Sequence, residues 1–304
     1  MSKQSPGLTE RPALGGSLTA VGRKGLQEWG TEKILFLFAL SAITGLALIA
    51  FFILHEGLPI IISKGLQGFV LSTDWAPSAG RFGILAMIAG SVAVTGGALA
   101  VAVPLGLGSA IALTEFCPRG PARLLKALIE LLAGIPSVVY GFIGLVVLVP
   151  LIRNVLGGPG LSVLAASVVL GVMILPNIVS ISMDAVLAVP QSYREGSIAL
   201  GATNWQTVHR VVLRAARSGI VAAIILGMGR AVGETMAVLM VAGNSVLVPH
   251  SITDPVRTLT SNIALEMGYA AGEHRQALFA TGIVLFVFIM ILNAVAAWAS
   301  RRRT

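Results

Sequence analysis

The chain alternates long apolar runs with short polar segments from residue 34 to its end. Each run is long enough to cross about 30 Å of hydrocarbon as a helix that rises about 1.5 Å per residue. The first run exceeds the apolar core of a signal peptide and lacks a small-x-small cleavage site, so we interpret it as a retained span. The pattern predicts six membrane-spanning helices, over residues 34–54, 84–112, 124–149, 162–187, 217–243 and 276–299.

Composition agrees with this pattern. Of the 304 residues, 56% are hydrophobic and 11% are charged, and the mean hydropathy is +0.90. A soluble domain carries about 25% charged residues, so most of this chain is suited to a solvent without water. The predicted fold class is an all-α polytopic membrane protein with six transmembrane helices.

The basic residues indicate how these spans are oriented. Fifteen of them lie before the first span, in the second and fourth connections, and after the last span, whereas five lie in the other connections. Because Lys and Arg are enriched in cytoplasmic segments, both termini are predicted to be cytoplasmic. The fifteen are Lys3, Arg11, Arg23, Lys24, Lys33, Arg119, Arg123, Lys126, Arg194, Arg210, Arg214, Arg217, Arg301, Arg302 and Arg303. The five are Lys64, Arg81, Arg153, Arg257 and Arg275.

The same pattern divides the chain into four parts. Residues 1–32 are polar and Gly-rich and are interpreted as a cytoplasmic N-terminal tail, and residues 301–304 form a basic C-terminal tail. Residues 33–80 contain the first transmembrane helix and a periplasmic loop, and residues 81–300 contain a five-helix core. The net charge of +8 does not indicate nucleic-acid binding, because the basic residues do not gather into a patch with aromatic residues.

The sequence offers little chemistry for catalysis or metal binding. Cys117 is the only cysteine, and the four histidines are scattered singly, so neither a disulfide framework nor a metal site is predicted. No phosphate-cradling G-x-x-x-x-G-K-[S/T] motif surrounds any lysine, and no nucleophilic arrangement has local support. We therefore expect a non-enzymatic subunit without a cofactor of its own, with ATP and Mg bound by a partner.

The fourth connection, residues 190–216, is predicted to form a helix, a tight turn and a second helix. Pro190 suits the first position of a helix, and Gly201 suits the left-handed position that ends one. Thr203 and Gln206 have the spacing of a capping box that starts the second helix. An ordinary connector between spans is one interpretation. The apolar surface of Tyr193, Leu200, Ala202 and Trp205 favours a docking element for a partner.

Two charges interrupt the fifth apolar run, in "GMGRAVGETMAV" (227–238). On a continuous helix, Arg230 and Glu234 lie on one face at i and i+4 and can pair. Gly229 and Gly233 form a GxxxG stripe that lets another helix approach closely, so we expect the pair to face the bundle interior. The pair is either a structural staple between helices or a pathway for an anion, and its depth in the membrane favours the pathway.

The third run contains Pro136 and Ser137 in "ELLAGIPSVVYGFIGL" (130–145). Two interpretations remain open here. The proline breaks the span and exposes a half-helix N-terminus toward an anion, or it produces an ordinary proline kink.

The loop carries a specific resemblance. Glu195-Gly196-Ser197, with Gly201 six residues after the glutamate and Val211-x-Leu213 further on, resembles the EAA loop of binding-protein-dependent ABC importer permeases of the MetI-like family. In that family the loop is a coupling helix seated in a cleft of the ATPase subunit. Gly196 and Ser197 stand where alanine is usual, and Arg214 stands where proline is typical. The residues that the resemblance assigns to ATPase coupling are Glu195, Gly196, Ser197, Leu200, Gly201, Ala202 and Trp205.

The spans carry a narrower resemblance. The stretch 130–145, "ILPNIVSISMDAVLAVP" (174–190) and "LGMGRAVGETMAVLMVAGN" (226–244) resemble phosphate-specific ABC permeases, and the last is similar to the PstC type. The resemblance covers residues 80–300 and implies a type I ABC importer architecture in the bacterial inner membrane. It implies a PstA-like permease as heterodimer partner, a PstB-like ATPase dimer and a PstS-like periplasmic phosphate-binding protein. The residues predicted to line the substrate pathway are Arg230, Glu234, Thr235 and Ser137.

The predicted function is therefore a permease subunit of an ATP-driven phosphate importer. Three alternatives stay open at this point. One is a permease for another oxyanion such as sulfate or molybdate, and another is an ion-coupled secondary anion carrier. The third is a membrane interaction protein for phosphate signalling, a role that is compatible with transport.

Overall fold

The computed structural model describes the backbone of residues 18–301 and the side chains of residues 32–118 and 120–295. The chain divides into two compact units, Met1–Phe52 and Ile53–Thr304, and each is described by itself. The outer parts of the two predicted tails, residues 1–17 and 302–304, lie outside the described residues.

Helix α1 (Leu18–Lys64) forms the described part of the first unit and continues into the second. The helix begins at Leu18, within the residues assigned to the N-terminal tail. Large apolar side chains such as Phe36, Phe38 and Ile43 are exposed along it. The segment Glu32–Lys64 is long and apolar enough to span a membrane, which agrees with the predicted first span.

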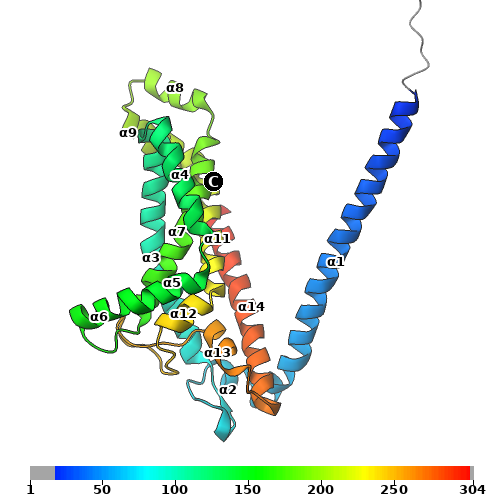
Figure 1. The fold of residues 1–304 in the computed structure, drawn as a ribbon, viewed down its shortest axis with the longest axis vertical. Helices are drawn as coiled ribbons and strands as arrows, with labels where there is room; N and C mark the ends of the chain where they lie inside the picture. The colour runs from blue at the N-terminus through cyan, green and yellow to red at the C-terminus, as the bar shows by residue number, and fades with distance from the viewer. Residues whose placement is uncertain (1–17, 302–304) are drawn as a thin grey trace, which may run out of the picture. The chain divides into compact units, whose positions relative to one another are not determined.

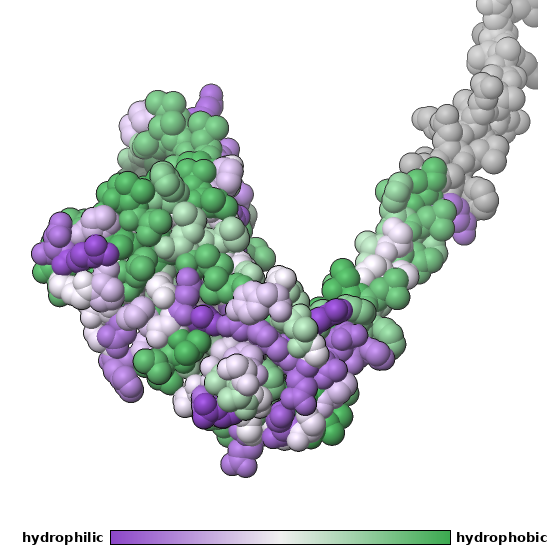
Figure 2. Space-filling model, turned by 60° about the horizontal axis from the view of Figure 1, so that its bottom comes forward, coloured by the Kyte–Doolittle hydropathy of each residue, from purple (hydrophilic) through white to green (hydrophobic). Residues whose placement is uncertain are grey.

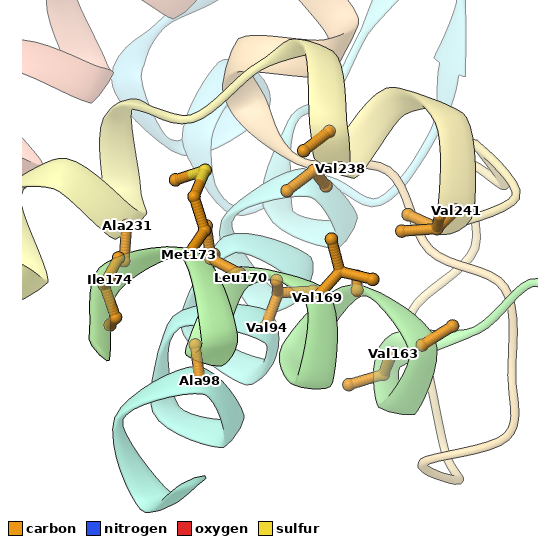
Figure 3. Close-up of a cluster of buried hydrophobic side chains, with 14 of the residues drawn as sticks. Val94, Ala98, Val163, Val169, Leu170, Met173, Ile174, Ala231, Val238 and Val241 are labelled. Atoms are coloured by element: carbon orange, nitrogen blue, oxygen red, sulfur yellow. The ribbon is translucent and has the colours of Figure 1, made fainter. Parts of the chain in front are cut away.

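The core of the second unit is built on helices α3 (Leu85–Ile111), α7 (Val163–Leu187) and α11 (Arg217–Gly233). Small residues let α3 and α7 approach closely: a Cβ on Gly97 would collide with the Ser167 side chain. The Ser167 hydroxyl also donates to the Val94 carbonyl across the two helices, 3.3 Å apart. Figure 3 shows the apolar side chains of this cluster, including Leu170, Met173 and Ile174 of α7, facing α3, α11 and α12. Close packing through small residues is the usual basis of helix association in a membrane.

Three further predicted spans are confirmed with small changes of boundary. The second corresponds to Leu85–Phe116, where a π-helical turn, Ala112–Phe116, extends α3. The fourth corresponds to Val163–Leu187, and the sixth to Gly272–Val295 within α14 (Gly272–Arg301).

The third span differs from the prediction of a helix over 124–149. Helix α4 (Arg119–Ala133) ends before Pro136, and a new helix begins at Ser137. Proline lacks a backbone N–H and disfavours helical geometry in the preceding residue, so the chain breaks here rather than kinking. The apolar segment that can span is Ser137–Leu156. It consists of α5 (Ser137–Ile143), a π-helical turn (Gly144–Leu148) and α6 (Val149–Leu156).

The fifth span is also interrupted, although a continuous helix over 217–243 was predicted. Helix α11 ends at Gly233 and helix α12 (Met236–Val241) follows after two residues. At its other end α11 follows the segment Asn204–Ala215 with a bend of 68°. The described residues thus contain five helices able to span a membrane by length and composition, or up to six if this bent pair is one span.

The two ends of the second unit differ in character. The loop end carries residues 190–216, and the hairpin end carries the antiparallel strands β1 (Trp75–Ala76) and β2 (Arg81–Phe82) (Figure 1). A short 3₁₀ turn joins the strands, and two short helices, α2 and α13, lie at the same end (Figure 1). Their bounds are Leu66–Val70 and Leu259–Glu266. Figure 2 shows polar residues over much of the hairpin end and apolar residues along the sides.

A buried carboxylate ties the hairpin end together. The Glu266 side chain, 9% exposed, accepts a bond from Arg257 Nη1 at 2.6 Å. Its other oxygen accepts from Trp75 Nε1 at 3.0 Å and lies 2.8 Å from His274 Nε2. One residue of α13 therefore connects the β-hairpin, the 242–258 segment and the start of α14.

A turn at the same end is closed by Asp254. Its carboxylate accepts backbone N–H bonds from His250 and Ser251 at 2.9 and 2.8 Å. These bonds hold the pKa of Asp254 below its ordinary value, since they stabilise the charged form. Their contribution to stability is complete above the ordinary pKa of an aspartate and is lost as pH falls through the lowered folded-state value.

Replacing Glu266 by alanine should strongly destabilise the hairpin end. The change leaves Arg257, 15% exposed, without its ion-pair partner, and such a loss costs about 3–5 kcal/mol for a buried pair. Thermal unfolding of the detergent-solubilised protein measures the effect. Glu273→Ala is the matched control, because that carboxylate is 61% exposed in its pair with Lys64 and such pairs contribute about 0–1 kcal/mol. Equal stability of the two variants would contradict the role assigned to Glu266.

Candidate functional site

The predicted pair of Arg230 and Glu234 does not form. Arg230 lies in the last turn of α11, whereas Glu234 lies beyond the helix in an extended conformation (φ −69°, ψ 131°). The Glu234 N–H bonds to the Ala231 carbonyl at 3.2 Å, which tightens the last turn and directs the chain off the helix axis. Among the described ion pairs none joins these two side chains. The i, i+4 argument was wrong because it required a helix that stops at Gly233.

Glu234 instead bonds to groups on both sides of the break between α11 and α12. Its Oε1 accepts the backbone N–H of Ala237 at 3.2 Å, so the carboxylate caps the N-terminus of α12. Its carbonyl accepts a bond from the Thr260 hydroxyl of α13 at 2.9 Å. The Thr235 hydroxyl donates to the Gly233 carbonyl at 3.3 Å. Backbone groups freed by the break thus have internal partners, as a low-dielectric environment requires.

The break in the third span lies against the break in the fifth. A Cβ on Gly141 would lie 2.9 Å from Ala237 Cα, so α5 and α12 are in close contact. The Tyr140 hydroxyl donates to the Leu132 carbonyl in the last turn of α4 at 2.8 Å. The structure therefore brings the two interruptions together where α5 packs on α12.

The other predicted pathway residues lie at the edges of these breaks. Ser137 is the first residue of α5, one turn before Tyr140, and is partly exposed. Thr235 precedes α12. Sequence reasoning missed Tyr140 and Thr260. Tyr140 stood in the quoted stretch 130–145, but only the fold shows which carbonyl its hydroxyl reaches.

Gly229, Arg230 and Gly233 form an uncovered surface on α11, which we call the α11 face. A Cβ on either glycine would meet nothing within 4 Å, and the Arg230 side chain is exposed. Within the described part of the chain, no helix makes the close approach predicted for the glycines. The expectation that Arg230 faces the interior of this chain's own bundle is therefore wrong.

The 190–216 loop has the predicted local structure. Helix α8 (Gln191–Ala199) begins after Pro190, and Gly201 has the expected left-handed conformation (φ +83°). The capping box is complete: the Thr203 side chain accepts from Gln206 N–H at 3.3 Å, and the Gln206 side chain accepts from Thr203 N–H at 2.9 Å. The second helix continues through three short elements to α11. These are α9 (Asn204–Thr207), a π-helical turn (Val208–Val212) and α10 (Leu213–Ala215).

The residues assigned to ATPase coupling divide into two groups. Leu200 is 91% exposed, Trp205 is 62% exposed, and Glu195, Gly196 and Gly201 are also exposed. Ser197 points inward, where its hydroxyl lies 2.9 Å from the Thr207 hydroxyl, and Ala202 is partly buried. The outer group presents an apolar surface around Leu200, and the inner group supports it.

Among the described residues, no group of three or more His, Cys, Asp or Glu side chains could hold a metal ion. The Lys126 ammonium of α4 lies 3.2 Å from Asp184 and 3.9 Å from Glu130.

Comparison with known proteins identifies a family. Residues 102–304 match the family described as binding-protein-dependent transport system inner membrane component. The chain is 43% identical over 285 residues to the probable ABC transporter permease protein YqgH of Bacillus subtilis, covering 91% of this chain and 92% of that protein. It is 38% identical over 255 residues to the phosphate transport system permease protein PstC of Mesorhizobium japonicum, covering 77% and 78%.

Solved structures support the same architecture. A permease chain of a bacterial alginate ABC transporter matches with a TM-score of 0.66 at 15% identity, covering 91% of this chain and 96% of that one. The inward-facing MetNI methionine ABC transporter matches with a TM-score of 0.54 at 22% identity, covering 73% and 94%. At these identities the similarity concerns the fold.

If Glu234 acts as a cap, an oxygen acceptor at this position should suffice for stability. Glu234→Gln keeps an oxygen that can accept the Ala237 N–H bond, whereas Glu234→Ala removes it at a cost of about 0.5–2 kcal/mol. We expect only the alanine variant to unfold at lower temperature. Glu130→Ala, which removes an exposed carboxylate, is the control. Equal destabilisation by glutamine and alanine would show that the charge, not the acceptor, holds the break.

Proposed function

Because the chain belongs to the family of binding-protein-dependent transport system inner membrane components, we propose that it is a PstC-like permease subunit of an ATP-driven phosphate importer. It is a multi-pass protein of the bacterial inner membrane. In this role it forms half of the translocation pathway and does not hydrolyse ATP itself. The PstC relatives, 38% identical over most of the chain, support phosphate as the substrate.

The observation that carries the proposal is the exposed Arg230 at the interruption of an apolar span. A charge at mid-membrane depth is costly against lipid, by about 2.5–3.5 kcal/mol on insertion scales. The cost is removed if the α11 face borders a water-filled path. A guanidinium there offers a planar fork of donors that matches phosphate oxygens.

The α11 face also suggests where a second permease subunit packs. Gly229 and Gly233 leave room for a closely approaching helix, and this chain does not fill it in its described part. We propose that a PstA-like subunit covers this face, so that Arg230 lies at the boundary between the two permeases. The partner then shields Arg230 from lipid while leaving it open to the path.

The loop end is proposed to bind the ATPase. Leu200 and Trp205 provide exposed apolar surface on a helix–turn–helix that is held together by its own capping box. We propose that this loop and both termini lie in the cytoplasm, as the distribution of positive charge predicts, where a PstB-like ATPase dimer works. A PstS-like binding protein delivers phosphate to the hairpin end. Closure of the ATPase dimer on ATP moves the loop, and the two permeases rock to release the anion inward.

The function is tested by uptake of labelled phosphate into vesicles containing the four-component complex. We expect ATP-dependent uptake that excess unlabelled phosphate suppresses and that sulfate and molybdate leave unchanged. Arg230→Gln should assemble normally but reduce uptake at least a hundredfold, because the anion loses its fork of donors. Glu130→Gln, which neutralises an exposed carboxylate of α4, is the control.

Three results would contradict these proposals. Stronger competition by sulfate would reassign the substrate, and uptake by this chain alone under a proton gradient would indicate a secondary carrier. Normal uptake by Arg230→Gln would remove Arg230 from the pathway while leaving the importer intact.

Leu200→Asp should weaken ATPase binding without unfolding the subunit. The side chain is almost fully exposed, so the folded chain loses little. Burying a leucine side chain in an interface contributes about 1.5–3 kcal/mol, which corresponds to at least tenfold in affinity. Co-purification of the ATPase at graded concentrations measures the change. Leu247→Asp changes a leucine that is 72% exposed outside the loop and should bind the ATPase as the unmodified chain does. ATPase retention by Leu200→Asp would refute the docking surface.

A further inference from the structure

One buried ion pair connects the exposed loop with the transmembrane core. Arg194 lies on the inward side of α8, and its Nη2 is 2.8 Å from Glu115 Oε1 at the end of α3. The two side chains are only 15% and 12% exposed. An ion pair this far out of water is far less screened than the surface pairs of the same subunit.

The same guanidinium also holds the end of α7. It donates to the Val189 carbonyl at 2.7 Å and to the Val186 carbonyl at 3.0 Å. Carbonyls at a helix C-terminus carry partial negative charge and lack helical partners, so a cation is favourable there. Arg194 therefore joins α8 to the ends of α3 and α7, two of the three helices that form the core of the second unit.

The end of α3 is shaped to receive this contact. Residues Ala112–Phe116 form a π-helical turn, closed by a bond from Cys117 N–H to the Ala112 carbonyl at 2.9 Å. Such turns insert one residue into a helix and often occur at functional sites. The turn places Glu115 against Arg194, and it places Phe116 beside Trp205, with ring centroids 6.2 Å apart.

The space between α8 and the ends of α3 and α7 is partly open. A cavity of about 710 Å³ opens there, lined by Leu113, Thr114, Met183, Leu187, Arg123 and Lys126 among others. The main packing neighbours of α8 are α9 and the Val208–Val212 turn, both within the loop. Arg194 thus supplies direct side-chain bonds from α8 to both α3 and α7, beside the apolar packing of Val212 of the loop on Val186 and Val189.

We propose that Arg194 and Glu115 are positioning residues that transmit loop movement to α3 and α7. This inference rests on the proposed function, because the loop moves only if an ATPase drives it. The ion pair with Glu115 transmits the movement to α3, and the two bonds from Arg194 to the Val186 and Val189 carbonyls transmit it to α7. Removing Glu115 therefore disconnects α3 while Arg194 still holds α7.

The test uses the complete complex with Glu115→Ala, Arg194→Gln and, as control, Glu130→Gln, which neutralises an exposed carboxylate of α4. We expect Glu115→Ala to retain the ATPase and its hydrolysis rate within about twofold, while uptake of labelled inorganic phosphate falls about tenfold. The ATP consumed per phosphate then rises about tenfold. A merely structural role would lower assembly, hydrolysis and uptake in proportion and leave that ratio unchanged. Arg194→Gln should give a larger loss than Glu115→Ala.

A second measurement does not depend on the substrate. Amide hydrogen exchange is compared with and without trapping of the ATPase by ATP and vanadate. In the unmodified and Glu130→Gln complexes, trapping should alter exchange in both residues 190–216 and residues 112–116. In Glu115→Ala the response of the loop should remain, while that of residues 112–116 should fall, with the Phe116–Trp205 contact as the remaining link. An undiminished response of residues 112–116 in Glu115→Ala, or the absence of that response from the unmodified complex, would overturn the inference.

The two proposals fail differently. A complex that takes up no phosphate but shows the exchange pattern contradicts the assigned substrate and retains the link. A complex that takes up phosphate with an unchanged ATP-to-phosphate ratio in Glu115→Ala contradicts the link and retains the importer.

Discussion

A helix interrupted inside an apolar span must find partners for the backbone groups that it frees, and the central part of this structure depends on that constraint. Where water is scarce, each unpaired N–H or C=O costs several kcal/mol, on the order of 2–7. The breaks in the third and fifth spans meet this requirement with side chains. Tyr140 bonds to the Leu132 carbonyl, Glu234 bonds to the Ala237 N–H, and Thr260 bonds to the Glu234 carbonyl. The bonds of Glu234 hold the chain where α11 ends, in the last turn that carries Arg230, the residue on which the proposed pathway rests.

Close packing of small residues supplies the frame for these breaks. Gly97 and Ser167 bring α3 against α7, and Gly141 brings α5 against α12. Gly229 and Gly233 are equally small, but in the described part of this chain no helix packs against them. The described part of this subunit thus contains small residues that are used for packing within the chain and small residues that are left uncovered. At the loop end, the Arg194–Glu115 ion pair joins α8 to α3 beside a cavity, and Val212 packs on Val186 and Val189.

Sequence reasoning succeeded where the determining interactions are local. The apolar runs of the second, fourth and sixth spans predicted their helices within a few residues, since lipid favours helix in any long apolar segment. The turn at Gly201 and the capping box at Thr203 were predicted because each depends on neighbours within three residues. At residues 134–136 a break was one of two interpretations, whereas the continuous helix predicted across residues 234–235 was wrong. The proline gave a signal for the first break, but neither of its two interpretations could be preferred.

By itself, the sequence determined that this is a helical membrane protein with a helix–turn–helix loop, an arginine within its fifth apolar run, and the motifs of an ABC permease. Hydropathy, caps and turn residues act over a few positions, so a linear pattern carries them. Only the tertiary structure decided that Glu234 caps α12 instead of pairing with Arg230, that the α11 face is open, and that Glu115 meets Arg194. Each of these depends on elements far apart in the chain or on where a helix stops. Those outcomes follow from which backbone groups can be satisfied in three dimensions, and residue spacing alone does not encode them.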